Sequence, residues 1–299
     1  MILRFAFCLN DEYASYVRIP IVSIIDNHIN YCNLEFHILS DGISKKNQDN
    51  LLSLEEGYNN VNIKIHIIND SNLKELKTGN WPIHTWYRIL LPSIIPSEID
   101  KILYLDVDTL VNHNLLELFN INITDKSIAG ILDPQTFNKL TFLRCGYSQE
   151  KGYICAGVLL MNLDYWRKNN LADKIIKWAK LNDSKIKFPD QDAINYICSD
   201  SKIVLPFKYN FMYAYNQDFF IKDRKLKLEL ENAKKNPFII HYCNPAPWYK
   251  EFNKNFMFEL WQNYNKKLKK PVRRSYKSQG LLLWKIIIWR LIHFKFNLL

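Results

Sequence analysis

The chain has 299 residues, of which 48% are hydrophobic and 14% aromatic, so it can bury a sizeable core and is not an intrinsically disordered protein. Its formal net charge of +10 comes from one segment: residues 266–299 contain ten Lys or Arg and no Asp or Glu, whereas residues 1–265 contain 30 basic and 30 acidic residues. The six cysteines stand singly, with no Cys-x-x-Cys pair, so neither a disulfide framework nor a zinc site is indicated.

Strand and helix patterns alternate along the first 105 residues. Such alternation is typical of an α/β protein with a doubly wound, mostly parallel sheet. The pattern predicts strands at Ile2–Leu9, Leu34–Leu39, Val61–Ile67 and Ile102–Leu105, and helices at Glu12–His28, Ser44–Leu54 and Thr85–Leu91.

The remaining body continues the α/β pattern. It predicts strands at Ser127–Leu132, Gly157–Asn162 and Phe238–His241, and helices at Asp164–Lys168, Leu171–Leu181, Gln191–Cys198 and Phe252–Lys269. The change of composition near residue 265 predicts a body of residues 1–265 and a basic, aromatic C-terminal helical segment of residues 266–299.

Two carboxylates, Asp106 and Asp108, directly follow the apolar strand Ile102–Leu105. At this spacing in an extended strand both side chains point to the same face. Ligand sites in parallel sheets gather at the carboxyl ends of strands. Hard oxygen ligands there suit a divalent Mg or Mn ion, which would also hold a diphosphate. By itself the pattern is weak, because Asp190-Gln191-Asp192 repeats it and a solvated strand end with two acids explains it as well.

Five further patches lie where this architecture places site residues: Cys8–Tyr13 after the first strand, Thr85–Arg88, Cys155–Asn162, Phe188–Asn195, and His241–Trp248 after the last strand. In this order and spacing, the patches resemble glycosyltransferase family 8, and most of all its bacterial galactosyl- and glucosyltransferases of lipopolysaccharide and lipooligosaccharide assembly. The resemblance runs from about residue 3 to residue 250.

The resemblance implies a glycosyltransferase A-type, Rossmann-like fold and retaining transfer of a hexose, galactose or glucose, from a UDP-sugar. It also implies Mn²⁺, or Mg²⁺, as the metal. Asp106 and Asp108 match the family's metal-binding pair, and His241 matches the third protein ligand. Taken alone, a histidine at a strand end is more often a satisfied core residue.

The remaining family positions concern the two substrates. Asp190 and Gln191 match the pair beneath the donor sugar, where Asp190 would bind sugar hydroxyls and Gln191 would act as a weak nucleophile or steady the transition state. Asp133 matches an acid on the acceptor side. The positions that would bind the UDP-sugar also include Cys8, Asn10, Tyr13, Arg88, Val107, Cys155, Ala156, Asn244 and Lys250.

Three positions depart from the family pattern. Asn10 stands where an Asp commonly contacts uracil, and Cys155 stands where an Asn usually contacts the donor sugar. In the loop after His241, Asn244 replaces a Gly, and the Lys before Pro-Trp is lost by a one-residue deletion, which makes Lys250 the candidate replacement.

The C-terminal segment predicts a membrane partner. Basic residues there alternate with Leu, Ile and Trp in residues 281–294, a composition found in interfacial helices rather than in nucleic-acid-binding tails. Lys285 and Arg290 interrupt a stretch barely long enough to span a bilayer. We therefore expect a cytoplasmic protein attached peripherally to the anionic inner face of the membrane, acting on a lipid-linked oligosaccharide and not on nucleic acid. A helix docked on the body is the alternative.

Three other functions compete with this interpretation. A haloacid-dehalogenase-type phosphatase would need its Thr two residues after the second Asp, whereas Thr109 follows Asp108 directly. A sugar nucleotidyltransferase or dinucleotide-binding protein would need a Gly-rich turn after the first strand, which the chain lacks. The third is a catalytically weak or non-catalytic UDP-sugar-binding relative that acts through its membrane tail, and the departures from the family pattern motivate it.

Overall fold

The computed structural model describes residues 1–212, 215, 221–243, 246–249 and 257–274. The chain divides into two compact units, residues 1–243 and 244–299. The functional division at residue 265 stays a prediction.

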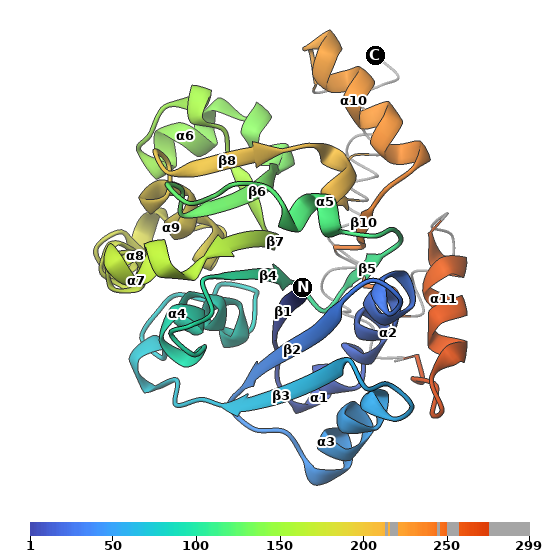
Figure 1. The fold of residues 1–299 in the computed structure, drawn as a ribbon. Helices are drawn as coiled ribbons and strands as arrows, with labels where there is room; N and C mark the ends of the chain where they lie inside the picture. The colour runs from blue at the N-terminus through green and yellow to red at the C-terminus, as the bar shows by residue number, and fades with distance from the viewer. Residues whose placement is uncertain (213–214, 216–220, 244–245, 250–256, 275–299) are drawn as a thin grey trace. The chain divides into compact units, whose positions relative to one another are not determined.

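A seven-stranded sheet with the order β3-β2-β1-β4-β7-β6-β8 runs through the first unit (Figure 1). Four of its pairings are parallel, and the two pairings of β7 are antiparallel, which confirms the predicted mostly parallel sheet. The strands are β1 (Ile2–Cys8), β2 (Asn33–Ser40), β3 (Val61–Ile67), β4 (Lys101–Leu105), β6 (Ile128–Leu132), β7 (Ile154–Asn162) and β8 (Lys202–Leu205).

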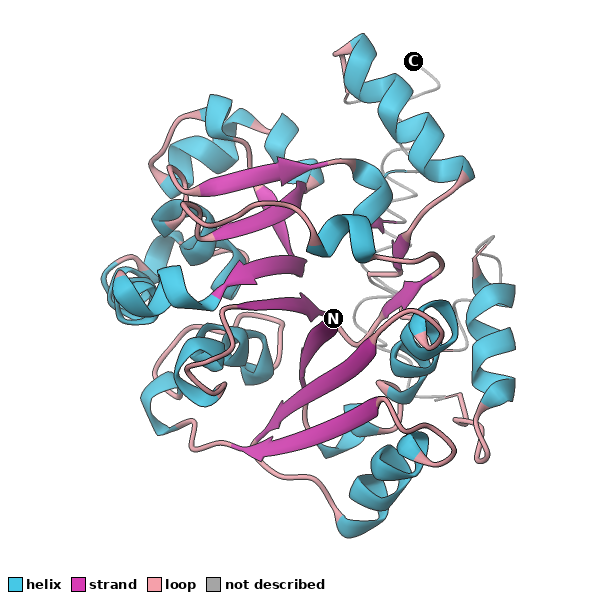
Figure 2. Cartoon of the chain, viewed as in Figure 1, coloured by secondary structure: helices cyan, strands magenta, loops and turns pink. Residues whose placement is uncertain are grey.

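Helices cover both faces of this sheet (Figure 2). Phe5 of β1 packs on one face against His28 of α2 and Phe119 of α5. The helices of the first unit are α1 (Asp11–Ala14), α2 (Arg18–His28), α3 (Lys45–Leu52), the 3-10 helix η3 (Ile83–Leu90), α4 (Leu91–Ile94), α5 (Leu116–Phe119), α6 (Lys139–Cys145), α7 (Leu163–Lys168), α8 (Leu171–Leu181), α9 (Pro189–Ile197) and α10 (Arg224–Lys235).

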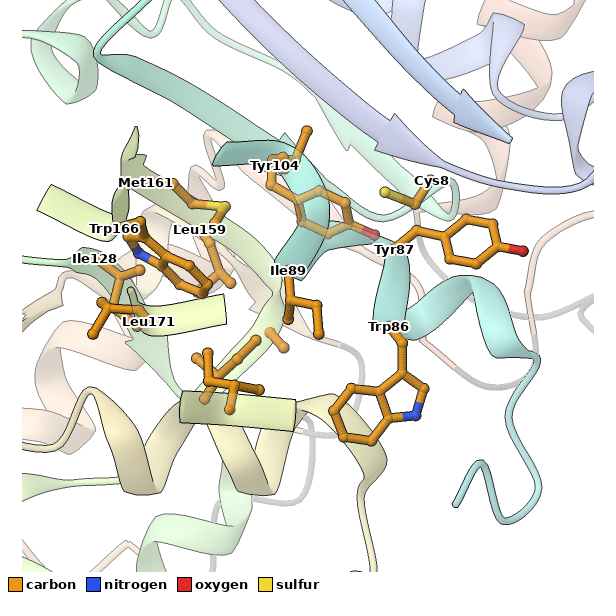
Figure 3. Packing of buried hydrophobic residues seen from close by; sticks show 14 of the residues in the cluster. Cys8, Trp86, Tyr87, Ile89, Tyr104, Ile128, Leu159, Met161, Trp166 and Leu171 are labelled. Carbon is orange, nitrogen blue, oxygen red and sulfur yellow. The ribbon is translucent and has the colours of Figure 1, made fainter. Parts of the chain in front are cut away.

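The opposite face carries an extensive hydrophobic cluster (Figure 3). Ile102 and Tyr104 of β4 point into it, together with Trp86 of η3 and Trp166 of α7. Leu103 and Leu105 alternate to the other face and are equally buried. At about 25 cal/mol per Å² of apolar surface, burial on both faces fixes this strand firmly, and with it the residues at its end.

A second, three-stranded sheet with the order β5-β10-β9 stands at the carboxyl end of β4. It contains β5 (Thr109–Val111), β9 (Phe211–Met212) and β10 (Ile239–His241). Since β5 begins three residues after Asp106, this sheet connects the acidic turn to segments that lie far away in the sequence.

The predicted helix Glu12–His28 is wrong as one helix. It is two helices, α1 and α2, with a break between Ala14 and Arg18. Pro20 causes the break, because a proline lacks a backbone N–H and is tolerated only in the first turn of a helix. The second helix therefore begins at Arg18.

Several boundaries and short elements also differ from the predictions. The helix predicted over Thr85–Leu91 is the 3-10 helix η3, followed by α4. The helix predicted over Phe252–Lys269 corresponds to α11 (Phe258–Lys267) in the second unit, and residues 252–256 lie outside the described residues. The predictions missed β5, β8, β9, α5, α6 and α10.

Candidate active site and metal centre

The acidic pair lies in a turn that follows β4. The strand ends at Leu105, and the N–H of Thr109 donates to the carbonyl of Asp106 at 3.1 Å, which closes the turn over Val107 and Asp108. We expected the carboxylates to share a face because they belong to an extended strand. That reason is wrong, since the strand has already ended, and it is the turn that carries Asp108 to the same side as Asp106.

His241, at the end of β10, completes the cluster. β10 pairs with β5 so that His241 lies opposite Thr109. Its Nε2 lies 3.2 Å from Asp108 Oδ1 and 3.7 Å from Asp106 Oδ2. Burial opposes a charge on the ring, but its anionic neighbours, Asp108 among them, outweigh burial and raise the pKa of His241 above its ordinary value. The ligand atoms of the three residues all lie within 4.8 Å of one another.

These donors fit a divalent cation. Ligands in adjacent positions of an octahedral ion, each about 2.1 Å from the metal, lie about 3 Å apart, close to the spacing between Nε2 and the carboxylates. Two carboxylates and an imidazole suit Mn²⁺ and also allow Mg²⁺. Asp106 Oδ1 accepts from Tyr104 Oη at 2.7 Å, so Oδ2 remains for an ion.

Arg88, in η3, places a buried positive charge beside this cluster. Its Nη2 donates to Asp106 Oδ1 at 3.0 Å, and its Nη1 donates to the carbonyl of Ala156. The guanidinium lies 4.2 Å from the centre of the Tyr104 ring. Burial works to lower the pKa of Arg88, but Asp106 and Asp190 outweigh it and raise that pKa, so the side chain stays charged.

Asp190 lies at the start of α9 and is buried. Its Oδ2 is 3.0 Å from Arg88 Nε, an ion pair whose geometry does not make a hydrogen bond. Burial raises the pKa of Asp190 to about 6 in spite of the opposing charge of Arg88. A buried carboxylate with one good ionic partner and free lone pairs can accept hydrogen bonds from ligand hydroxyls.

Gln191, which follows Asp190, contacts Asp133, the acid predicted to lie on the acceptor side. Its Oε1 accepts from the backbone N–H of Ala156 at 2.8 Å, and its Nε2 donates to Asp133 Oδ2 at 3.4 Å. Burial raises the pKa of Asp133 to about 6. Asp133 also caps the turn after β6 by accepting from Gln135 N at 2.8 Å.

The second acid of Asp190-Gln191-Asp192 has a different role. Asp192 is fully buried, and it accepts hydrogen bonds from Tyr153 Oη at 2.7 Å and from the backbone N–H groups of Lys187 and Phe188. Arg144 forms a bidentate ion pair with it. With these partners, Asp192 is a structural anchor for the start of α9.

The predicted base-binding patch follows β1. β1 pairs with β4 (Ala6 opposite Tyr104), so its end adjoins the acidic turn. Asn10 caps α1 by accepting from Tyr13 N at 3.0 Å. Cys8 is buried, which raises the pKa of its thiol, and Arg88 partly opposes this effect. Val107 is buried within the turn. Contact of these residues with a base or a ribose stays a prediction.

β7 supplies Cys155, Ala156 and Gly157 to the site. The sulfur of Cys155 lies 3.9 Å from His241 Nδ1 and accepts from Gly157 N at 3.4 Å. A Cβ atom built on Gly157 would lie 2.6 Å from Asp106 Oδ2 and would also meet the His241 ring. Absence of a side chain at Gly157 is therefore what lets the histidine and the acid approach each other.

The structure thus brings together residues from β1, η3, β4, β7, α9 and β10. Asn244 and Lys250 lie outside the described residues. Sequence reasoning missed the roles of Tyr104, Gly157 and Asp192. Gly157 and Asp192 left a signal, since both stand within patches that the sequence analysis singled out.

Comparisons with known proteins agree with this geometry. The family model of glycosyl transferase family 8 matches residues 4–251. A lipopolysaccharide 1,2-glucosyltransferase of Escherichia coli is 29% identical over 93% of this chain and 85% of its own length. A lipopolysaccharide 1,3-galactosyltransferase of Salmonella typhimurium is 25% identical over 72% of this chain and 64% of its own length.

The fold matches a solved structure as well. The galactosyltransferase LgtC, in complex with donor and acceptor sugar analogues, superposes with a TM-score of 0.80 and 24% identity, covering 90% of this chain and 97% of that one. At that identity the likeness establishes the fold, which is the predicted glycosyltransferase A type. The family model covers most of the chain, and the chain therefore belongs to glycosyltransferase family 8.

Proposed function

We propose that this protein is a retaining hexosyltransferase that moves galactose or glucose from a UDP-sugar to a lipopolysaccharide- or lipooligosaccharide-type acceptor. One observation carries the proposal: the Asp106–Asp108–His241 cluster, which fits a divalent cation, lies beside buried Arg88, which in turn contacts Asp190. A diphosphate site and a sugar site are thus adjacent. Lipopolysaccharide glucosyl- and galactosyltransferases among the relatives support the choice of hexose and acceptor.

The leaving diphosphate would lie beside the metal ligands and Arg88, which contact each other through Asp106. A divalent cation held by Asp106, Asp108 and His241 would neutralise the charge that develops on UDP as the anomeric bond breaks. Arg88 is held by Asp106 and the Ala156 carbonyl, so its charge is already oriented before a donor binds. Such preorganised charge stabilises a transition state without a cost of reorientation.

Asp190 and Gln191 would hold the donor sugar. Asp190 has lone pairs free for sugar hydroxyls, whereas both ends of the Gln191 amide are occupied, by Ala156 N and by Asp133. A neutral amide is a poor nucleophile, and one whose oxygen already accepts a hydrogen bond is poorer still. We therefore favour attack by the acceptor on the face from which UDP departs, with the UDP oxygen taking the acceptor's proton and Gln191 steadying the sugar.

The acceptor would approach from the side of Asp133. Its carboxylate is joined to the donor-sugar residues through Gln191, so the two substrates would meet there. Because the pKa of Asp133 is raised to about 6, its carboxylate can both accept from an acceptor hydroxyl at neutral pH and take up a proton slightly below it.

The basic segment would hold the enzyme at the anionic inner face of the cytoplasmic membrane, close to a lipid-linked acceptor. Its first described part, residues 266–274, contains six of the ten basic residues. Within the described part of the chain, none of the helices is both long and apolar enough to cross a bilayer. Attachment through charge and aromatic side chains is the mode that this composition favours.

The decisive experiment is a UDP-release assay with Mn²⁺ across UDP-galactose, UDP-glucose, UDP-N-acetylglucosamine and UDP-glucuronic acid. An intact site releases UDP slowly to water even without an acceptor. We expect metal-dependent release from one hexose donor, its loss in Asp106→Asn, and its retention in Asp125→Asn, which changes an exposed acid outside the site.

The other outcomes separate the alternatives. UDP-sugar binding without turnover of any donor would favour the non-catalytic relative and direct attention to Cys155 and the shortened loop after His241. Absence of UDP-sugar binding, or equal turnover in Asp106→Asn, would overturn the proposal.

A further inference from the structure

We propose that Asn210 is a positioning residue that fixes the tautomer of His241 and thereby aims the Nε2 lone pair at the metal site. This inference rests on the proposed metal centre and concerns a residue that the sequence patterns did not single out. Asn210 directly precedes β9, which pairs in parallel with β10 so that Met212 lies opposite His241. It is completely buried, and its Oδ1 lies 3.2 Å from His241 Nδ1.

The imidazole ring of His241 has two nitrogens with different roles. A neutral imidazole has one N–H, and the other nitrogen carries the lone pair that a metal needs. Nε2 is the nitrogen that faces Asp108 and Asp106, at 3.2 and 3.7 Å. When a cation binds Nε2, the remaining ring proton must therefore stand on Nδ1, and an oxygen at hydrogen-bond distance from Nδ1 keeps it there.

Asn210 is a better acceptor for Nδ1 than the thiols of Cys155 and Cys243, which also interact with His241. The sulfur of Cys155 lies farther away, at 3.9 Å, and already accepts from Gly157 N. A thiol is also a weak acceptor, whereas an amide oxygen is a strong one. If a donor replaced the amide oxygen, the proton would move to Nε2 and point at the two carboxylates, where it would exclude a cation.

The position in the fold supports this role. Asn210 is fixed between the 3-10 helix Phe207–Tyr209 and β9, and β9 is attached to the strand that carries His241. The acceptor and the ring therefore move together. Partners of this kind on ligating histidines typically change metal affinity about 10–100-fold when removed.

The test measures Mn²⁺ binding by the loss of the free-ion electron paramagnetic resonance signal, with UDP at saturation. Asn210→Leu has a similar shape and no acceptor, and we expect it to weaken the Mn²⁺ Kd about 10–100-fold. Asn210→Asp keeps an acceptor and should bind at least as tightly as the wild type. Asn112→Leu is the matched control, because Asn112 adjoins β5 of the same small sheet and donates to the carbonyl of Pro237 instead.

A double-mutant cycle assigns the effect to the histidine. In a His241→Ala background, Asn210→Leu should change the Mn²⁺ Kd by less than about twofold, since the group it orients is gone. Undiminished weakening in that background would show that Asn210 acts on the fold in general, and would overturn the proposal.

A spectroscopic measurement on the wild type covers the case in which Asn210→Leu does not fold. In ¹⁵N-histidine-labelled protein with Mg²⁺ and UDP, two-bond ¹H–¹⁵N correlations should report a proton on Nδ1 of His241. A proton on Nε2 would overturn the inference. If the wild type itself binds no Mn²⁺, or Asp106→Asn binds it equally well, the proposed metal site fails. The other case is that the wild type binds Mn²⁺ and Asp106→Asn does not. If Asn210→Leu then binds Mn²⁺ as tightly as the wild type, the metal site stands and only the role of Asn210 fails.

Discussion

At the scale of single residues, Gly157 is the position where the smallest change should have a large effect. Its Cβ would lie 2.6 Å from Asp106 Oδ2 and closer still to His241 Cε1, nearer than atoms in contact can stand. Its φ is not in the left-handed region, so alanine suits the backbone and the clash alone would act. We expect Gly157→Ala to lower kcat/KM for metal-dependent UDP release about 100-fold, the usual consequence of displacing a catalytic group by about 1 Å.

Gly42→Ala is the control for that substitution, because a Cβ there meets no atom within 4 Å. Urea denaturation of both variants separates a local effect from a loss of fold. If Gly157→Ala retains full activity and its unfolding midpoint, the metal ligands do not need the close approach that we describe.

The candidate ligands could be predicted from the sequence, Asp106 and Asp108 as a pair of acids after a buried strand and His241 through its match to the family pattern. The residues that support them could not. Gly157 and Asn210 act through close approaches between β7, β9 and β10, which are far apart in the sequence. Asp190 and Asp192 stand in one motif, and only the burial of Asp192 against Tyr153 and Arg144 reveals that it is structural.

At the scale of elements, the edge of the large sheet contains a polar cluster that should make stability depend on pH. His37 of β2 is buried; its Nδ1 lies 3.0 Å from Nε2 of His66 in β3, and its Nε2 lies 2.7 Å from Glu35 Oε1. Burial lowers the pKa of His37 to about 4, with His66 adding to the effect and Glu35 opposing it.

Because the folded pKa of His37 lies below its ordinary value of 6.5, the unfolded chain binds the proton more readily. Stability from this group is full above pH 6.5 and falls as the pH drops from about 6.5 to 4. Across this interval each step of one pH unit weakens the folded state by about 1.4 kcal/mol, so we expect a loss of about 2 kcal/mol between pH 7 and pH 5. Urea denaturation at both pH values measures it.

Other groups also titrate in this range, so the prediction concerns the difference in pH dependence between the wild type and a variant that lacks His37. Burial raises the pKa of Asp133 and Asp190 to about 6, which makes the folded state gain stability as the pH falls. We therefore compare the wild type with His37→Gln, whose free energy of unfolding should lose about 2 kcal/mol less over the same interval. An identical pH dependence in both proteins would refute the assignment to His37.

The strands of five or more residues were all predicted from the sequence, whereas the shorter strands β5, β8 and β9 were missed. β1 to β4 of the large sheet each present five or more residues with a clear apolar pattern. β5 and β9 have three and two residues, and they exist because β10 pairs with both of them. No local signal distinguishes such strands from loops, since their hydrogen bonds come from tertiary contacts.

At the scale of the whole molecule, the packing of the fold does not explain how unevenly charge is distributed along the chain. Residues 1–265 are neutral overall, whereas residues 266–299 carry ten positive charges and no negative ones. Asn265, directly before this segment, makes two hydrogen bonds with the backbone of Val272 within it, at 2.7 and 3.0 Å. A truncation meant to test membrane attachment should therefore keep residues up to 274.

Deleting residues 275–299 removes four basic residues and the Leu, Ile and Trp residues of 281–294. Each basic residue near an anionic surface contributes about 1 kcal/mol, so we expect the truncation to weaken sedimentation with phosphatidylglycerol-containing liposomes at least about 100-fold. Acceptor-independent hydrolysis of the UDP-hexose should stay within about twofold, because the site residues that we describe all lie before residue 244. Binding of the full chain should also weaken as salt is added.

A charge-matched control shows whether liposome binding depends on the tail itself or only on the total positive charge of the protein. Replacing the exposed residues Lys45, Lys46, Lys225 and Lys235 by Gln removes the same charge from the body. If this variant loses liposome binding as fully as the truncation does, net charge and not the tail is responsible. If the truncation loses hydrolysis together with liposome binding, residues 275–299 support the fold, and the docked-helix alternative replaces the membrane anchor. Retained hydrolysis with lost liposome binding in the truncation alone assigns membrane attachment to the tail.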